Sequence, residues 1–380
     1  MRDITDSLSG KLLCSMRKTM AVCGLDELLE IAPALADLQT FLSSPVGQLD
    51  WILASAEYLG QESLPFVFVA YDDKQPVALV SLVRKEPFST YRQFQTFEPV
   101  GFCYRDADAL QGLTDLMAAR GMPVFLERIP DDPILIRALK KSYRGRALMI
   151  VKESDSCPYI DIEGGADQMI ASLSARLRSD LRRAARKADG QGGAACFIHA
   201  PTAPEEVDVL WEKALAVEAA GWKGRSGSAL SLDRQYGSFL YGFARRACTR
   251  GMLRINFLEI GGQAAATEIA LVGGNRYWLL KIGYDEHFAK CSPGMLLMEQ
   301  TLRYAADLGL QSYEFMGSAA DWTRRWTEKE RGTYSVRTYP YNLRGAMLLT
   351  GGLVAHIFRK LRPGAIRGEK TEEAVKCVST

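Results

Sequence analysis

The chain of 380 residues is poor in the residues that build metal and redox centres. It has three histidines, and its eight cysteines never come closer together than nine residues, so no CxxC pair is present. Zinc sites and thioredoxin-type redox sites need such pairs or several histidines. We therefore expect no metal site, and the dispersed thiols favour a reducing compartment.

The sequence also lacks an excess of one charge and a secretory signal. It has 47 Lys+Arg against 45 Asp+Glu, a net charge of +2. This balance excludes a generally basic nucleic-acid coat protein and disfavours nucleic acid as a partner. Arg17 and Lys18 interrupt the short apolar run near the N-terminus, as they would not in a signal peptide. We expect a cytoplasmic protein.

Hydrophobic residues, by contrast, are plentiful, and their pattern repeats along the chain. They make up 47% of the sequence, enough for the core of two domains. Residues 67–83 read as a strand, a polar turn and a second strand, and residues 255–271 have the same layout. Gln75 matches Gln263 at an offset of 188 residues.

A helix-like stretch that ends in a glycine follows each of these hairpins. Residues 107–119 lead through Gly121 into a strand, and residues 293–308 lead through Gly309 into another, at the same offset. Two matching units in register indicate an internal duplication. We predict a boundary near residues 150–165, where a proline and a glycine pair precede a new helix.

Caps and periodicity predict the elements of the second half. Helices are expected from Ser172 to Gly190, from a capping box at Thr202 through Glu218, and from Ser292 to Gly309. Strands are expected at 253–260, 264–272, 276–283 and 336–341. Helices that alternate with the strands of a mostly antiparallel sheet predict the α/β (α+β) class. The predicted units are residues 1–155, residues 156–345 and a C-terminal segment, 346–380.

The order of motifs from residue 172 onward resembles a known family. A basic helix (LSARLRSDLRRAARK) is followed by EAAGWKGRSGSAL, a hairpin, GYD, PGMLL, and finally YEFMGS with a tryptophan soon after. This order resembles GNAT-related acyltransferases known in bacteria as cellulose-biosynthesis-associated acetyltransferases. They are similar in architecture to Fem-type aminoacyltransferases, which contain two GNAT-like halves. The resemblance implies a tandem GNAT-like fold and acyl transfer from an activated donor, usually a thioester, to an amine or hydroxyl.

The segment Ser292-Pro293-Gly294-Met295 is the predicted donor site. A helix that begins with Ser-Pro-Gly presents unpaired backbone N–H groups with no bulky side chain, which favours a phosphate, although the same residues are also simply a good helix start. The glycine pair that ordinary GNAT enzymes carry here is missing. The donor is therefore left open between acyl-CoA, acyl carrier protein (acyl-ACP) and aminoacyl-tRNA, with no permanently bound cofactor.

The basic helix supplies a second candidate anion site, with Arg182 and Arg186 as its predicted cofactor-binding residues. Six basic residues fall within twelve positions, opposed only by Asp180. Such a run is either a solvated helix face or a docking surface for a CoA phosphate, an acidic carrier protein or a tRNA backbone.

Glu268 is the candidate catalytic carboxylate. If residues 274–275 form a two-residue turn, Glu268 lies directly opposite Lys281. The pair is then either an ordinary cross-strand ion pair, or a base that deprotonates an ammonium acceptor, held ionised by a lysine that helps to polarise the acyl carbonyl. Tyr284, which follows on the same strand, is the third candidate catalytic residue.

The remaining predicted site residues are substrate-binding candidates that rest on the family resemblance. Trp222 and Lys223 lie in a glycine-rich loop that would cover the acceptor, Asp285 follows the strand end, and Trp322 and Arg325 close the family pattern. Trp222 either forms an acceptor wall or anchors its loop in the core.

The C-terminal residues 345–358 form an apolar run of fourteen residues, followed by a basic stretch. This run is too short to span a bilayer, which needs about 20 residues. It either packs on the second half or lies in a membrane interface, and the second alternative would point to a lipid acceptor and to a peripheral position at the inner membrane.

Together these observations predict an N-acyltransferase that moves an acyl group from acyl-CoA or acyl-ACP to an amine, with a long-chain or sphingoid-type amine as one candidate. The first alternative is a Fem-like enzyme that takes its residue from charged tRNA. The second is a non-catalytic GNAT-like scaffold in envelope or polysaccharide synthesis.

Overall fold

The computed structural model describes residues 19–23, 25–36, 38, 44–59, 64–85, 90–94, 98–221, 230 and 233–351. Helices and strands alternate along the described chain, and the strands join into one mixed sheet of 13 strands. The predicted α/β (α+β) class is confirmed.

The N-terminal half follows the order strand, two helices, antiparallel strands, helix, strand, helix, strand. Its elements are β1 (Thr19–Cys23), α1 (Leu25–Leu35), α2 (Leu49–Ala54) with the π-helical turn η2 (Ser55–Leu59), β2 (Leu64–Asp72), β3 (Gln75–Lys85), β4 (Thr90–Arg92), the short β5 (Cys103–Tyr104), α3 (Ala107–Ala119), β6 (Val124–Pro130), α4 (Pro133–Tyr143) and β7 (Ala147–Asp161).

The C-terminal half begins with two extra helices and then repeats the same order. Its elements are α5 (Gly165–Ser172), α6 (Ala175–Asp189), β8 (Ala194–His199), α7 (Pro204–Ala219), α9 (Arg234–Cys248), β9 (Leu253–Ile260), β10 (Gln263–Gly273), β11 (Arg276–Tyr284), the 3₁₀ helix η3 (Glu286–Cys291), α10 (Pro293–Asp307), β12 (Ser312–Glu314), α11 (Asp321–Arg324) and β13 (Glu330–Pro340).

The internal duplication predicted from the offset of 188 residues is therefore confirmed. The hairpin β2–β3 corresponds to β9–β10, and α3–β6 corresponds to α10–β12. Left-handed backbone conformations recur at the same offset, which places the turns of the two halves at equivalent positions. These pairs are Asp73 and Gly261, Gly121 and Gly309, and Arg128 and Met316.

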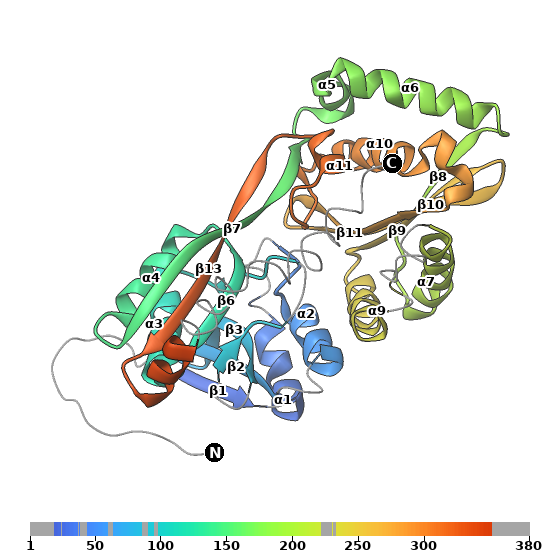
Figure 1. Cartoon of the computed structure of the whole chain (residues 1–380). Helices are drawn as coiled ribbons and strands as arrows, with labels where there is room; N and C mark the ends of the chain where they lie inside the picture. Colours follow the sequence, from blue (N-terminus) through green and yellow to red (C-terminus); the bar gives the residue numbers. More distant parts are fainter. Residues whose placement is uncertain are drawn as a thin grey trace.

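The two halves exchange their last strands (Figure 1). β7 leaves the N-terminal half and pairs with β12 of the C-terminal half, while β13 returns and pairs with β6 of the N-terminal half. β7 and β13 also pair with each other along most of their length. β7 runs through the predicted boundary after residue 155, and the division into units stays a prediction.

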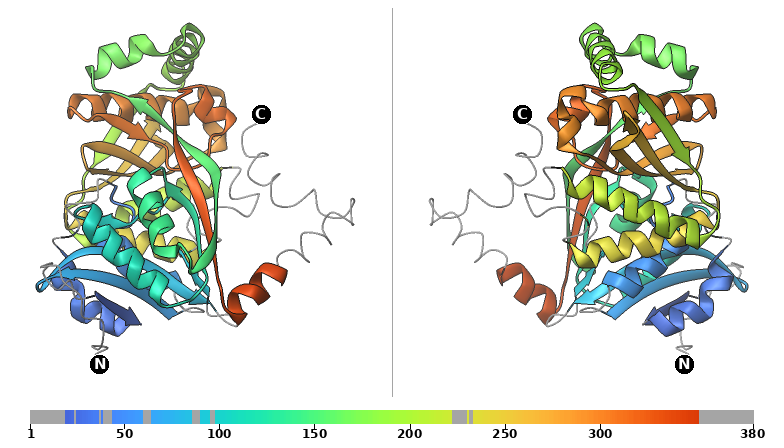
Figure 2. Two further views of the ribbon diagram at one scale, coloured as in Figure 1. Left: turned by 90° about the vertical axis from the view of Figure 1, so that its left-hand side faces the viewer. Right: turned by 90° about the vertical axis from the view of Figure 1, so that its right-hand side faces the viewer.

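Helices cover both faces of the sheet in each half. In the C-terminal half, α5, α6 and α10 lie on one face of β9–β11, and α7 and α9 lie on the other (Figure 1). In the N-terminal half, α3 and α4 share one core and α1 and α2 another (Figure 2). Trp51 of α2 joins the halves, because its ring packs edge-on against Phe239 and Phe243 of α9 at 4.7 and 4.9 Å.

Three details of the predicted elements are corrected. α6 begins after Ser174, whose hydroxyl accepts a hydrogen bond from Leu177 N, because the separate helix α5 occupies the residues up to Ser172. α7 begins after Ala203 without the predicted capping box, and the Thr202 N–H instead bonds Glu206. β13 begins at Glu330 rather than at residue 336, since β7 offers it a long partner.

Candidate active site

In each half, two parallel strands at the centre of the sheet separate after a short paired stretch and leave an opening between them. β4 and β6 pair only as far as Arg92 and Phe125, and β11 and β12 pair only as far as Trp278 and Glu314. Beyond these pairs the left-handed conformations of Arg128 and Met316 redirect the chain. A strand edge that loses its partner leaves backbone N–H and C=O groups for a ligand. The openings occupy equivalent places in the two halves.

A β-bulge in the hairpin β10–β11 changes the predicted geometry of Glu268. The two-residue turn 274–275 is present, as expected. However, Leu280 is an extra residue in β11, so Lys281 lies opposite Ile269 and Glu268 lies opposite Ile282. The predicted pairing of Glu268 with Lys281 is wrong, because it assumed an unbroken register and a slip of one residue exchanges the faces of a strand.

Glu268 lies instead under α10, with none of its surface exposed. Its Oε1 accepts hydrogen bonds from the Tyr277 hydroxyl at 2.6 Å and from Asn256 Nδ2 at 3.1 Å. Its Oε2 accepts from the hydroxyls of Tyr313 at 2.9 Å and Thr301 at 3.0 Å. Burial raises the pKa of Glu268, although these four bonds favour the charged form. We interpret Glu268 as the structural link between β10, β12 and α10.

Lys281 lies on the opposite face of β11, the face covered by α7 and α9. Its Nζ lies 5.1 Å from the ring centroid of Tyr236 in α9. Tyr236 is 5% exposed, and its hydroxyl donates a 2.6 Å hydrogen bond to Glu98 Oε1. The bulge therefore moves Lys281 away from Glu268 and towards a carboxylate of the N-terminal half.

The predicted donor residues gather at the start of α10. Ser292 takes a left-handed conformation (φ 49°), and its carbonyl accepts from Met295 N at 3.0 Å. Gly294 is half-buried beside Tyr284: a Cβ at this position would contact only Tyr284 Cδ1, at 3.8 Å. The structure therefore brings Tyr284, Ser292, Gly294 and Met295 together.

The backbone just before α10 forms the 3₁₀ helix η3, and its N–H groups bond acceptors within the same segment. Asp285 caps it, because Asp285 Oδ1 accepts from His287 N at 2.9 Å and its carbonyl accepts from Phe288 N at 3.1 Å. Ser292 N bonds the carbonyl of Ala289 at 3.0 Å. In α10 itself, Pro293 has no N–H group, and Met295 N and Leu296 N bond the Ser292 carbonyl at 3.0 and 3.3 Å. Few amides at the start of α10 are therefore left to cradle a pyrophosphate.

Arg182 and Arg186 are exposed on the outer face of α6. The opposite stripe of this helix is buried and consists of Leu177, Leu181, Ala184 and Ala188. The end of α6 reaches the start of α10, where Cys291 Sγ lies 3.3 Å from Gln191 Oε1. The two arginines therefore belong to an exposed basic surface beside the donor residues, directed away from the core.

The predicted substrate-binding residues do not form one cluster. Trp322 packs edge-on against Phe315 at 5.5 Å, and Arg325 donates to Asp180 of α6 at 2.9 Å, so both lie on the α6 and α10 side. Trp222 and Lys223 lie outside the described residues.

A pocket of about 180 Å³ fills the opening of the N-terminal half, where this half meets the other. We call it the junction pocket. Its lining comes from the end of β4, the segment that follows β4, and β6, namely Arg92, Gln93, Phe94, Glu98, Val100, Phe125, Glu127 and Arg128. Val100 also packs against the core cluster that contains Trp278 and Met316 of the C-terminal half.

Glu98 and Arg128 are the charged centre of the junction pocket. Glu98 is 6% exposed, and burial raises its pKa, while the Tyr236 hydrogen bond and the charges of Lys281 and Arg128 oppose this rise. Arg128 Nη2 donates to Met316 O at 3.3 Å. Arg128 thus reaches from the opening of the N-terminal half to the backbone that follows β12, and the buried Glu98 carboxylate lies near the charges of Lys281 and Arg128.

Sequence reasoning missed Glu98, Arg128 and Tyr236. Glu98 follows a short strand in an irregular segment, and no periodicity or motif singles it out. The duplication held one usable signal, because Arg128 precedes Met316 by the offset of 188 residues. Arg128 lies in β6, and Met316 follows the equivalent strand β12. The approach of Tyr236 to Glu98 depends on long-range packing.

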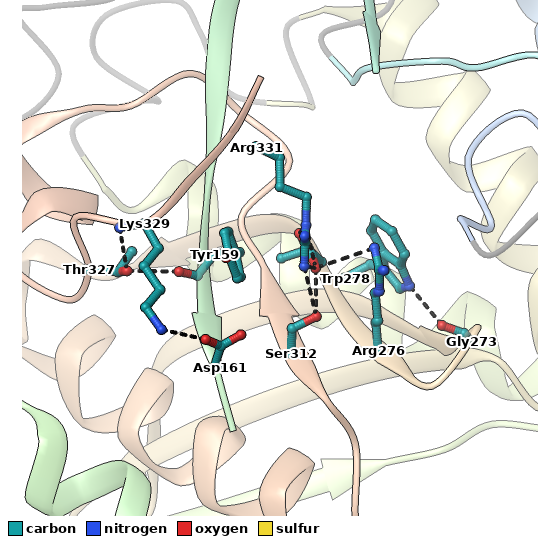
Figure 3. Close-up of polar contacts among 10 residues, drawn as sticks. Tyr159, Asp161, Gly273, Arg276, Trp278, Ser312, Thr327, Lys329 and Arg331 are labelled. Atoms are coloured by element: carbon teal, nitrogen blue, oxygen red, sulfur yellow. Dashed lines mark hydrogen bonds and ion pairs between the residues drawn. The ribbon is translucent and has the colours of Figure 1, made fainter. Parts of the chain in front are cut away.

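A second polar cluster fixes the exchanged strands next to this site (Figure 3). Glu314 of β12 is 2% exposed and accepts three hydrogen bonds from Arg331 of β13, at 2.6, 2.8 and 3.0 Å, and one from the Ser312 hydroxyl at 2.6 Å. The Arg331 guanidinium lies 3.9 Å from the ring centroid of Tyr159 in β7, and Arg276 of β11 approaches Glu314 at 3.7 Å. These contacts join four strands at the end of β12.

Two absences complete the description, each restricted to the residues that the structure describes. No helix there is long and apolar enough to cross a membrane. No group of three or more histidine, cysteine, aspartate or glutamate side chains there is arranged to hold a metal ion.

Comparisons with known proteins agree with this architecture. Residues 175–324 match the family model described as acetyltransferase (GNAT) domain. No curated protein matches the chain. Among solved structures, the chain is similar to FemX, with a TM-score of 0.55 and 10% identity over 87% of this chain and 99% of that one.

A second solved structure has the same overall fold. It is the C-terminal DUF2156 domain of a protein assigned as lysylphosphatidylglycerol synthetase from Agrobacterium fabrum, with a TM-score of 0.52 and 11% identity over 85% of this chain and 95% of that one. At these identities the likeness concerns the fold. With its GNAT domain at residues 175–324 and its two GNAT-like halves, the chain is an enzyme of the acyltransferase class.

Proposed function

We propose that the protein is an N-acyltransferase that moves an acyl group from a thioester, acyl-CoA or acyl-ACP, to an amine bound in the junction pocket. The observation that carries this proposal is the separation of β11 from β12 between the start of α10 and a pocket with a buried carboxylate. The cellulose-biosynthesis link of the resembling family stays a prediction.

The geometry supports a direct transfer. The thioester arm would follow the edge of β11 from Gly294 towards Lys281, and the amine would sit in the junction pocket. The amine nitrogen forms a bond to the thioester carbonyl carbon, and the carbon–sulfur bond breaks. Glu98 takes the proton that the ammonium must lose before it attacks. The nitrogen loses a second proton as the amide forms, and this proton passes through solvent to the leaving thiolate, which departs as the thiol. In this proposal, Lys281 stabilises the negative charge that develops on the carbonyl oxygen.

A second candidate, transfer from aminoacyl-tRNA, is favoured by a specific observation. The amides before α10 are engaged within η3, and the exposed face of α6 beside them is basic. A donor that binds through a phosphate backbone needs the basic face more than a free amide cradle. The similar fold of FemX fits this reading, and the other neighbour is named for an aminoacylated lipid, which would make a lipid the acceptor.

Replacing Gly294 by Val tests the thioester donor. The new side chain has room, so the fold should survive, but it stands where the donor would pass. We expect the Kd for an acyl-CoA, measured by calorimetry, to rise about tenfold or more, equivalent to the loss of one good contact. Gly112→Val, in the equivalent helix α3 with nothing near its Cβ position, should leave this Kd unchanged.

The two candidate donors are distinguished by which molecules bind the purified protein and from which of them it transfers a group. Equal affinity of Gly294→Val and wild type for every thioester offered would contradict the donor site. Nuclease-sensitive RNA bound to the wild type, together with transfer only from charged tRNA, would select the second candidate.

A further inference from the structure

One end of the N-terminal half carries an uninterrupted group of basic side chains. It lies where the turns α3–β6 and α4–β7 meet the chain that leaves β13, since Asn342 Nδ2 donates to Gly121 O at 2.8 Å and Tyr341 N donates to Arg146 O at 2.9 Å. We call it the basic end and define it by five exposed residues: Lys140, Lys141, Arg144, Arg146 and Arg344.

The basic end has little acidic charge to balance it. In the described part of the chain, none of its five members forms an ion pair with a carboxylate. The nearby Asp115 is engaged by Ser142 and Gln111, at 2.6 and 2.9 Å. Asp115 keeps its negative charge, but the five basic side chains outweigh it, so a polyanionic surface would meet a mainly positive field here.

Large apolar side chains project from the same end. Tyr341 is 70% exposed, Leu343 is 76% exposed and Met347 is 47% exposed. Leu343 and Met347 are four residues apart in the helix 343–351 and so share one side of it. This helix points away from the body of the protein (Figure 2).

The direction of this helix is fixed by its first turn. Asn342 caps it, because Asn342 Oδ1 accepts from Gly345 N at 3.0 Å. A side chain at Gly345 would stand 2.0 Å from the Pro340 carbonyl oxygen, so only glycine allows the chain to turn here. The exposed apolar side chains are therefore held at the tip of a folded element.

We propose that the basic end and the start of the helix 343–351 dock the enzyme on a membrane surface rich in anionic lipid. Exposed apolar side chains that project among basic residues match an interface of acyl chains and anionic headgroups. A nucleic acid would contact the basic side chains but would leave the exposed apolar side chains of the helix 343–351 in water. The sequence continues the pattern, since residues 352–358 are mostly apolar and residues 359–362 carry three basic side chains. The docking is independent of which donor or acceptor the enzyme uses.

Vesicle co-sedimentation of the full chain tests this proposal, with phosphatidylglycerol and phosphatidylcholine mixed in one vesicle preparation and phosphatidylcholine alone in the other. We expect salt-sensitive binding to the mixed vesicles only. Replacing Lys140 and Lys141 by Gln should weaken binding about 25-fold, at about fivefold for each charge near the surface. Leu343→Ser with Met347→Ser should weaken binding to the same vesicles at high salt as well.

The matched control removes the same charge from α6, at the other end of the molecule, as Arg176→Gln with Lys187→Gln. This control should bind the mixed vesicles as the wild type does. Failure of the wild type to bind them, or an equal loss in the α6 control, would overturn the proposal. Melting curves of every variant show that any loss of binding occurs in folded protein.

Discussion

Glu98→Gln is expected to lower kcat for amine acylation by about 10²–10⁴-fold, the usual contribution of a general base, while donor affinity stays the same. The amide keeps the size of the side chain and its place in the junction pocket, but it cannot accept the proton of the ammonium. Steady-state kinetics with a saturating donor measure the effect.

The matched control for this substitution is Glu127→Gln, the other carboxylate of the junction pocket. Glu127 is exposed at the rim, and its Oε1 lies 3.4 Å from Arg337 Nη2. We expect less than a threefold change in kcat, because an exposed pair of this kind contributes little. If Glu98→Gln keeps the wild-type kcat, Glu98 is not the base and the acceptor lies elsewhere.

The pH dependence of kcat gives a readout that a structural role of Glu98 would not produce. The base works as the carboxylate, so activity is lost as the pH falls through its pKa. Because burial raises the pKa of Glu98, this loss should begin at a higher pH than for an ordinary glutamate. The acidic limb should disappear from the residual activity of Glu98→Gln.

Glu268→Ala is expected to have the largest effect on stability, a loss of about 3–5 kcal/mol in the free energy of unfolding. The substitution removes the acceptor of four hydrogen bonds at a site with no solvent access. Two tyrosine hydroxyls, a threonine hydroxyl and an amide then lose the carboxylate to which they donate. Urea unfolding followed by tryptophan fluorescence measures the loss.

Glu259→Ala on the neighbouring strand β9 is the control, because its partly exposed ion pair with Lys213 at 2.8 Å should contribute at most about 1 kcal/mol. The milder variant Glu268→Gln separates structure from catalysis. It should melt earlier than the wild type but keep its turnover for each folded molecule. A fall of a hundredfold or more in that turnover would restore Glu268 as a catalytic group.

The fold was predictable from the sequence because duplication leaves a local record. The hairpin pattern, the glycine that ends each helix and the common offset are set by neighbouring residues, and the structure bears them out. The exchange of β7 and β13 leaves no such record, because the residue pattern of a strand does not depend on which half its partner strand comes from.

The candidate site was less predictable, for physical reasons that differ between residues. Tyr284, Ser292, Gly294 and Met295 are close in sequence, so their grouping followed from one turn and one helix start. Lys281 was placed on the wrong face because the extra residue Leu280 has no sequence signal that distinguishes a bulge from a regular strand. Glu98 became a candidate only through its contacts with the other half.

Hydrogen exchange of the whole enzyme, with and without a nonhydrolysable acyl-CoA analogue, tests the central claim most directly. If one thioester site lies between the halves, the bound analogue should slow exchange in β11 and at the start of α10, and addition of an amine acceptor should slow it around Glu98 as well. Unchanged exchange in β11 and α10 at a saturating concentration of the analogue would contradict the account.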